Sequence, residues 1–99
     1  MMTGFNKIIH QPVRLRIMAA LVALDLHDEI DFSFLSKLLD VTDGNLGAHL
    51  RKLEDSGYIL IKKTFVERKP RTYVVATEKG RKEFSKHVAA LEAILKNKD

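Results

Sequence analysis

The chain has 99 residues, of which 45% are hydrophobic and 30% are charged. This length predicts a single domain, and this balance is typical of a globular protein and not of a disordered one. The chain contains no cysteine, which excludes disulfides, thiolate metal ligands and thiol redox chemistry. No apolar run approaches the roughly 20 residues of a membrane helix, and residues 1–10 hold no signal-peptide core. We therefore expect a cytoplasmic protein with no membrane partner.

Positive charge is concentrated in the second half of the chain. Residues 1–50 contain 4 Lys and Arg against 6 Asp and Glu, a balance of −2. Residues 51–99 contain 13 against 7, a balance of +6, and the two halves sum to the net charge of +4. A small basic domain with this asymmetry suggests a polyanionic partner, although lysines also serve solubility alone. The positions of the charges must decide between the two.

The first predicted helix begins at Pro12, whose fixed φ suits a first helical turn, and runs to about Leu24. It has two apolar faces. One consists of Val13, Ile17, Ala20, Leu21 and Leu24, and the other of Leu15, Met18, Ala19 and Val22. Two apolar faces indicate packing on both sides. The helix is therefore either the central helix of one domain or a helix between its own core and a second subunit.

Residues 26–31 follow as a loop, with Ile30 and Phe32 in a very short strand. Ser33 is a suitable N-cap for a short second helix. The apolar residues that this helix is predicted to carry inward are Phe34, Leu35, Leu38 and Leu39.

The next turn leads into a third helix. Residues 40–42 form a tight connection, and Thr42 or Asp43 caps a helix that runs to about Ser56. Gly57 ends it in the position where glycine is common. Two short helices joined by such a turn form a helix-turn-helix.

From residue 58 the hydrophobic period changes from helical to alternating, which predicts a strand over 58–66. Residues 67–70 are predicted as a charged turn and 71–76 as the returning strand. Thr77 then caps a last helix over 78–96. Three helices, a hairpin and a final helix predict the α+β fold class, as a winged helix-turn-helix.

The third helix carries the residues best suited to a nucleic acid. Its core face consists of Leu46, Leu50 and Leu53. Its remaining surface consists of Gly44, Asn45, Gly47, Ala48, Arg51, Lys52 and Asp55. Such small side chains let a helix press into a groove, where Asn45 is suited to an adenine edge and Arg51 to a guanine or a phosphate. The amides of Asp43 and Gly44 lie at the positive end of the helix dipole and are suited to phosphate. The alternative is a short connecting helix with a hydrophilic back.

The hairpin concentrates cations around one turn. They are Lys62, Lys63, Arg68, Lys69 and Arg71. Glu67 opposes them locally, and Pro70 stiffens the tip. A stiff basic tip beside such a helix can lie along a DNA backbone or enter the minor groove. Basic tips also serve solubility, and lysines on edge strands block aggregation. The position directly after a helix-turn-helix favours DNA.

The motifs in this order resemble a known family. Residues 42–54 and 57–58 resemble the recognition helix of MarR/ArsR-like winged-helix transcriptional regulators of the compact, single-domain type. Residues 68–73 resemble their wing, and residues 77–81 the start of their last helix. The resemblance implies that 1–99 is one winged helix DNA-binding domain, which binds a pseudo-palindromic operator as a homodimer. The chain departs from the family by lacking the cysteine metal box of many ArsR-type sensors and by being shorter at both ends than full-length MarR proteins.

The last helix supports a dimer independently of the family. Its apolar residues follow a four-three-four spacing, which is typical of a helix that packs against another helix. Paired with the second face of the first helix, it forms a two-fold interface in our hypothesis. The predicted contacts are Leu15, Met18, Val22, Phe84, Val88, Leu91 and Leu95. The alternative is that this stripe closes the core of the monomer.

The histidines allow one metal hypothesis. Glu83 and His87 share a face of the last helix, and two such pairs at a dimer axis offer N and O ligands to a divalent ion. A Glu–His pair on a solvated helix usually has no such role, so we predict no metal and no cofactor. His49 is predicted as a packed, hydrogen-bonded residue, and His10 and His27 have no partners at ligand spacing. The chain has no phosphate-binding glycine loop, nucleophile elbow or His-Glu-x-x-His motif, so we expect no enzyme.

These patterns predict a sequence-specific DNA-binding transcriptional regulator that acts as a homodimer, with the helix over about 43–56 in the major groove. The wing over about 66–71 would lie on the flanking backbone or in the minor groove. The predicted DNA contacts are Thr42, Asp43, Gly44, Asn45, Ala48, Arg51 and Lys52 in the helix, and Lys62, Lys63, Arg68, Lys69 and Arg71 in the wing. Alternatives are a winged-helix module that binds protein, whose surface would be more apolar, and a metal-responsive repressor that uses Glu83 and His87.

Overall fold

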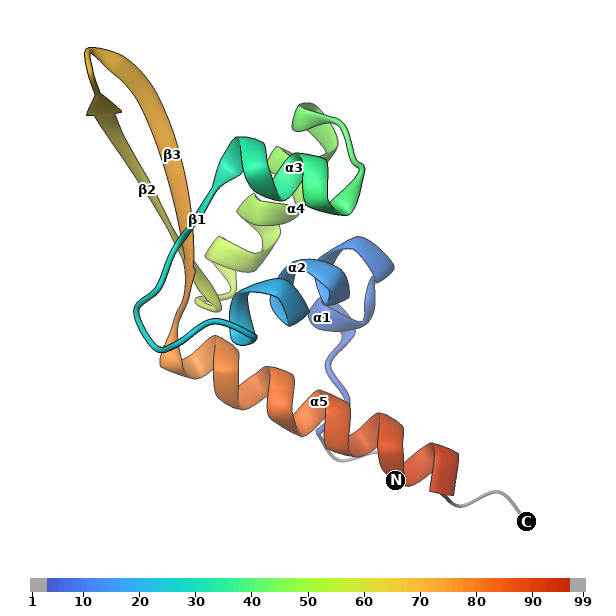
Figure 1. The fold of residues 1–99 in the computed structure, drawn as a ribbon. Helices are drawn as coiled ribbons and strands as arrows, with labels where there is room; N and C mark the ends of the chain where they lie inside the picture. Colours follow the sequence, from blue (N-terminus) through green and yellow to red (C-terminus); the bar gives the residue numbers. More distant parts are fainter. Residues whose placement is uncertain (1–3, 97–99) are drawn as a thin grey trace.

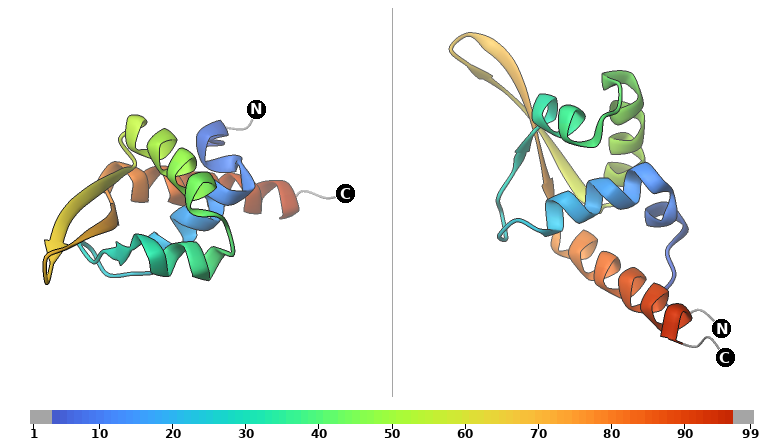
Figure 2. Two further views of the ribbon diagram at one scale, coloured as in Figure 1. Left: turned by 90° about the horizontal axis from the view of Figure 1, so that it is seen from above. Right: turned by 45° about the vertical axis from the view of Figure 1, so that its right-hand side comes forward.

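The computed structural model describes residues 4–96, in which helices form a body and a β-hairpin projects from it (Figure 1). The elements follow in the order α1 (Lys7–His10), α2 (Pro12–Val22), β1 (Ile30–Asp31), α3 (Phe32–Leu39), α4 (Asp43–Asp55), β2 (Ile59–Val66), β3 (Lys69–Ala76) and α5 (Glu78–Lys96). The hairpin and the C-terminal end of α5 lie at opposite ends of the molecule, whose extents are 57 × 25 × 21 Å (Figure 2). In this part of the chain, no helix combines the length and apolarity that a membrane crossing needs. The order confirms the winged helix-turn-helix, and α1 is an element that the sequence analysis missed.

The strands of the described residues form one antiparallel sheet in the order β1-β3-β2. β2 pairs with β3 along its whole length, residues 59–66. β1 pairs with β3 only at Val74 and Tyr73. The outer half of the hairpin therefore has no third strand beside it and projects as a two-stranded wing.

The tip of the wing is the two-residue turn of Glu67 and Arg68, and the four-residue turn predicted over 67–70 is wrong. Both residues have positive φ, 51° and 66°, which is the signature of a type I′ turn that matches the twist of a hairpin. Neither residue is the glycine or asparagine that usually marks this turn. Pro70 lies inside β3, where it is tolerated because β1 does not reach that position.

Side-chain caps define the ends of the helices. As predicted, the hydroxyls of Thr42 and Thr77 accept hydrogen bonds from the N–H three residues later, at 3.1 and 2.9 Å. Gly57 follows α4 with φ of 80°, which confirms the predicted C-terminal glycine. The prediction for α3 is wrong, because its N-cap is Asp31 and not Ser33, and the helix begins two residues earlier.

The short helix α3 packs against the body along one face. Leu35 and Leu39 are buried as predicted, but Phe34 and Leu38 are 58% and 54% exposed. The prediction that all four side chains point inward is therefore wrong. One face is all that a helix of 8 residues at the edge of the body can bury.

The two apolar faces of α2 are both used within one protomer. Ile17, Met18 and Leu21 are fully buried, and Leu15 and Val22 are half-buried against the same core. The helix lies between the α3–α4 pair and α5 (Figure 1). Met18 has no surface left for a partner, so the prediction that it contacts a second subunit directly is wrong.

One junction joins the end of α4, both strands and the start of α5. The Tyr58 carbonyl accepts a hydrogen bond from the Thr77 N–H at 3.0 Å, and the Thr77 hydroxyl donates to the Gly57 carbonyl at 2.7 Å. A Cβ on Gly80 would lie 2.1 Å from the Tyr58 carbonyl oxygen, so only glycine fits there. Beside it, the Arg81 guanidinium donates to two carbonyls just past the end of α2, each at 3.0 Å.

We expect Gly80→Ala to lower the free energy of unfolding by about 3 kcal/mol or more, because the added methyl meets backbone that cannot move without opening the junction. Gly47→Ala is the matched control, since no atom lies within 4 Å of a Cβ there. It should raise the free energy by about 0.5–1 kcal/mol through helix propensity. Urea unfolding followed by circular dichroism measures both. A Gly80→Ala protein as stable as the wild type would refute the close approach.

Candidate nucleic-acid interface

The turn between α3 and α4 is held by side chains of both helices and of α2. The Ser36 hydroxyl lies 2.8 Å from the Val41 carbonyl oxygen and 3.0 Å from an Asp43 carboxylate oxygen, and it donates its single proton to one of them. Arg16 donates to the Leu39 carbonyl at 2.8 Å. These bonds fix the direction in which α4 leaves the turn.

The sequence correctly predicts which face of α4 is free. Leu46, Leu50 and Leu53 are buried in the core. The residues of the predicted DNA-contact set on this helix and its cap are all exposed, namely Thr42, Asp43, Gly44, Asn45, Ala48, Arg51 and Lys52. Since the leucines fix the rotation of the helix, its polar side faces away from the body.

A groove of about 320 Å³ separates α4 from the sheet. Its cationic walls are Arg51 from α4 and Lys63 from β2, with Thr72 beside Lys63 on β3. Gly44 and Gly47 form its floor on the helix side, and a Cβ at either would have no neighbour within 4 Å. Packing within the protein therefore does not explain why either glycine lacks a side chain.

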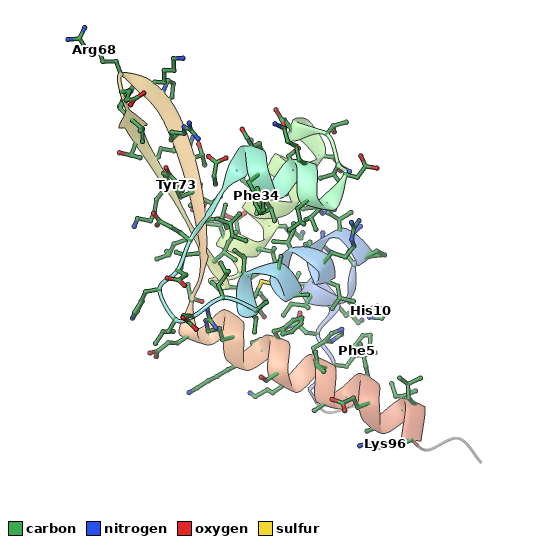
Figure 3. The ribbon with its side chains drawn as sticks, viewed as in Figure 1. Phe5, His10, Phe34, Arg68, Tyr73 and Lys96 are labelled. Atoms are coloured by element: carbon green, nitrogen blue, oxygen red, sulfur yellow. The ribbon has the colours of Figure 1, made fainter. Side chains whose placement is uncertain are left out.

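The five predicted wing cations do not form one patch. The pleat of β2 places Lys63 on the face toward α4 and Lys62 on the opposite face, together with Arg71 of β3. There Lys62 pairs with Glu29 at 3.0 Å and Arg71 with Asp31 at 3.4 Å. Arg68 and Lys69 occupy the tip, where the Arg68 side chain extends away from the body (Figure 3).

Both ion pairs are exposed, so each contributes little to stability and leaves its cation able to exchange partners. Lys63, Arg68 and Lys69 appear in none of the ion pairs of the described residues. The register therefore separates Lys63, on the face toward α4, from Lys62, Lys69 and Arg71 on the far face, and Arg68 lies in the turn between the strands.

The sequence analysis missed an aromatic residue on this surface. Phe65 lies on the same face of the wing as Lys63, because two positions along a strand share a face. Its side chain is 73% exposed. Strand alternation, continued outward from Ile61 and Lys63, was the signal that could have identified it.

His49 lies on the side of α4 that contacts Arg14 of α2. The prediction of a packed, hydrogen-bonded residue is confirmed. Its Nδ1 lies 3.2 Å from a guanidinium nitrogen of Arg14, which also donates to the Ile8 carbonyl. Burial, and secondarily the Arg14 charge, lowers the pKa of His49 below its usual value of 6.5. A neutral His49 can accept the Arg14 hydrogen bond, which ties α4 to α2.

His87 is fully buried, so the solvated Glu–His pair that was the alternative to a metal site is not what the structure has. Its Nδ1 accepts a hydrogen bond from the Asn6 N–H at 2.9 Å, and the rings of Phe5 and His10, which are neighbours in Figure 3, lie against its ring. Glu83 pairs with Lys86 on the surface instead. Residues 4–96 hold no group of three or more His, Cys, Asp or Glu that could bind a metal ion. The hypothesis of a metal site between two His87 side chains at a dimer axis is wrong, because this ring lies inside one protomer.

Comparisons with known proteins match this architecture. Residues 13–95 match the model of a family described as winged helix DNA-binding domain. An uncharacterized protein of Methanocaldococcus jannaschii is 35% identical over 91 residues, which are 92% of this chain and 96% of that protein. A transcriptional regulator homologue from Pyrococcus horikoshii OT3 has a similar structure, with a TM-score of 0.82 and 37% identity over 90% of this chain and 85% of that chain.

A more distant neighbour was solved with DNA. MepR of S. aureus, in a DNA complex, has a TM-score of 0.74 and 17% identity, and the match covers 90% of this chain and 70% of that chain. At this identity the similarity shows the fold alone. The family match confirms the winged helix DNA-binding domain that the resemblance stated from the sequence implies.

We expect the free energy of unfolding to fall as the pH drops below about 6.5, because burial, and secondarily the His10 charge, lowers the pKa of His87 in the folded protein. Above 6.5 both states hold His87 neutral and its contribution is complete. Below pH 6.5 His87 binds a proton in the unfolded chain but remains neutral in the folded protein until the pH is lower. Urea unfolding between about pH 7 and pH 5 measures this slope. His87→Gln, which can still accept the Asn6 hydrogen bond, should reduce this slope to the part that His49, whose pKa is also lowered, contributes, and an unchanged slope would refute the assignment.

Proposed function

Because the chain belongs to the family of winged helix DNA-binding domains, we propose that it is a sequence-specific transcriptional regulator that binds double-stranded DNA as a homodimer. One observation carries this proposal. The exposed polar face of α4 and the cationic inner face of the wing border a single groove, with Arg51 on one wall and Lys63 on the other. A helix for the major groove and a basic wing for the flanking backbone are thus presented on one side.

On α4, we assign base readout to Asn45 and Arg51. Asn pairs with adenine and Arg with guanine through two hydrogen bonds in the major groove. Both side chains are exposed on the free face. Gly44 and Gly47 have open space where a Cβ would lie, so DNA can approach the helix backbone closely beside them. The exposed start of α4 and its Thr42 cap are suited to a phosphate.

In the wing, we assign Arg68, Lys69 and Lys63 to phosphate contacts. Arg68 and Lys69 extend farthest from the body, and Lys63 faces the same side as α4. Lys62 and Arg71 contribute less to the affinity for DNA, because each must leave a surface carboxylate before it can bind a phosphate. Counterion release makes this class of contact sequence-independent and sensitive to salt.

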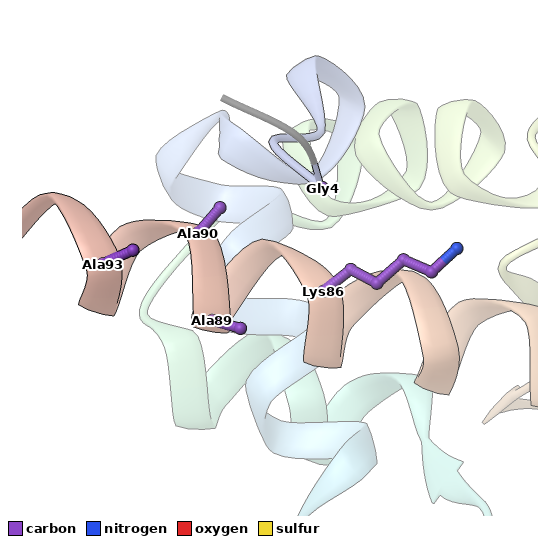
Figure 4. Close-up of a pocket in the computed structure, with 5 residues that line it drawn as sticks. All are labelled: Gly4, Lys86, Ala89, Ala90 and Ala93. Atoms are coloured by element: carbon purple, nitrogen blue, oxygen red, sulfur yellow. The ribbon is translucent and has the colours of Figure 1, made fainter. Parts of the chain in front are cut away.

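For the dimer, we assign the C-terminal half of α5 as the contact surface. Leu95 is 65% and Ile94 46% exposed, whereas Val88 and Leu91 are half-buried. A hollow of about 540 Å³, lined by Gly4, Lys86, Ala89, Ala90 and Ala93, lies on another side of α5 (Figure 4), because helical spacing separates positions 86, 89, 90 and 93 from 88, 91 and 95. Leu15, Val22 and Phe84 pack against their own core and can serve only at the edge of such a contact.

One observation favours the protein-binding alternative. Phe34 and Leu38 form an exposed apolar pair on α3. The surface formed by α4 and the wing instead carries amide, glycine and cationic residues, which suit DNA better than an apolar partner. We therefore retain DNA as the partner of that surface.

We expect Arg68→Ala to weaken binding to an operator and to random DNA by similar factors, because a phosphate contact carries no sequence information. Asn45→Ala and Arg51→Ala should weaken operator binding more, by about 1–3 kcal/mol for each lost base contact. The operator is obtained by selecting genomic fragments at about 150 mM salt, and fluorescence anisotropy gives each Kd. Lys82→Ala, which removes an exposed cation from α5, is the control and should change neither Kd.

Equal losses on operator and random DNA for all three variants would contradict these roles. The wild-type affinity should fall by about 10³- to 10⁵-fold between about 50 and 200 mM salt, if each subunit makes three to five phosphate contacts. An affinity that does not change with salt would refute DNA binding through this surface.

We expect Leu95→Lys to convert a dimer into a monomer, because two lysines would meet at the two-fold axis of an apolar contact. Sedimentation equilibrium measures the mass, and affinity for the full operator should fall toward that for a half-site. Leu60→Lys places the same charge on another exposed leucine, 55% accessible on β2, and should leave the dimer intact. A monomeric wild type, or a Leu95→Lys protein that remains dimeric, would refute this interface.

A further inference from the structure

Phe65 is the most exposed large hydrophobic side chain in residues 4–96, with 73% of its surface accessible. It lies in the outer half of the wing, directly opposite Pro70. The inner end of β2 begins with buried Ile59, but every residue from Lys62 to Val66 is exposed. Phe65 therefore has no hydrophobic core to join.

The fold itself gives this phenylalanine no reason to be apolar. β1 pairs with β3 no farther out than Tyr73 of β3, so neither a third strand nor a helix covers the wing at Phe65. An exposed aromatic residue on the edge strand β2 favours aggregation, and a polar residue there would avoid this. The side chain is thus better explained by something that binds to the wing than by folding.

The surroundings of Phe65 indicate the chemistry of that partner. The pleat places Phe65 and Pro70 on the same face as Lys63, the face that continues into the groove beside Arg51. Arg68 follows in the turn, and Lys69 lies beside it on the opposite face. An apolar pair with Lys63 on the side toward the body and Arg68 on the side toward the tip matches a surface that is apolar within and anionic at its edges. The minor groove of DNA has this pattern, with sugars and base edges between two rows of phosphates.

We propose that Phe65, supported by Pro70, is an apolar wedge that enters the DNA minor groove beside the half-site, pushes apart a base step and bends the duplex. This inference rests on the proposed function, because α4 must hold the wing against the same DNA. Wedges of this kind act best at flexible pyrimidine–purine steps, which are easily unstacked. The wing thereby contributes to sequence preference without a hydrogen bond to a base.

The test compares variants of the full chain on the selected operator. Phe65→Ala should weaken binding by about 5- to 100-fold, the range found when an aromatic side chain that stacks on a base is removed. It should leave the slope of log K against log salt unchanged, because no charge is lost. Lys69→Ala should reduce that slope by about 0.9, as expected for one phosphate contact. Phe65→Leu should keep most of the affinity, since leucine also serves as a wedge.

The bend and the fold supply independent readouts. Energy transfer between dyes at the two ends of the operator should show a smaller bend with Phe65→Ala than with the wild type. Leu60→Ala is the matched control, because Leu60 is exposed on the same strand but on the opposite face. It should change neither the affinity nor the bend. The midpoint of thermal unfolding should be the same for all of these variants, because Phe65, Lys69 and Leu60 all lie outside the core.

An unchanged Kd and an unchanged bend for Phe65→Ala would overturn the wedge and leave the proposed function intact. A changed salt slope for this variant would also overturn it, because the effect would then come from displaced cations. Failure of the wild type to bind DNA would refute the proposed function itself. Binding of the wild type to vesicles of anionic phospholipid, lost in Phe65→Ala while the DNA Kd is unchanged, would assign the side chain to a membrane and overturn the wedge.

Discussion

The close approach of Gly80 to the Tyr58 carbonyl is the constraint on which the rest of the structure depends. The first turn of α5 lies so near the start of β2 that there is no room for a single methyl group. Thr77 adds hydrogen bonds to the carbonyls of Tyr58 and Gly57 across the same gap. The end of α4, the start of β2, the end of β3 and the start of α5 are therefore fixed at one point. Arg81 then ties this point to the end of α2.

This junction determines how the two parts of the candidate DNA surface are oriented. α4 leaves it in one direction and the wing in another, with the groove between them (Figure 1). At its far end α4 is held by Ser36 and by the turn that Arg16 supports. A helix and a wing that must contact one duplex together bind it more tightly when they are held rigidly, because little conformational entropy is then lost on binding.

The regular elements could be predicted from the sequence because their signals are local. Thr42 and Thr77 lie at the starts of helices, the leucines of α4 repeat at helical spacing, and β2 alternates from Ile59 onward. The errors arose where a distant contact decides. Asp31 replaces Ser33 as a cap because β1 ends there, and His87 is buried because the N-terminal segment folds over it.

In the wing, prediction from the sequence failed for a different reason. Its cations were all identified, yet which face each occupies depends on the register of β2 against β3. The turn that sets this register lies at Glu67 and Arg68, which are poor residues for positive φ. Propensity alone therefore placed the turn around Pro70, and the division of Lys62 from Lys63 into opposite faces followed only from the structure.

Residues that violate local preference in this protein fall into two groups. Gly57 and Gly80 have a reason within the fold, one a positive φ and the other the contact with Tyr58. A second group has none, and it consists of Gly44 and Gly47 in open space on a helix, Glu67 and Arg68 in left-handed conformation, and exposed Phe65. Each of these choices lowers stability or solubility and lies on α4 or the outer wing, whereas His27 and Asp40, which also have positive φ, and the exposed Phe34, Leu38 and Leu95 lie elsewhere. Natural sequences depart from such rules mainly where a ligand binds. Several of the places where folding alone fails to explain the sequence thus lie on the surface that its charge assigns to DNA.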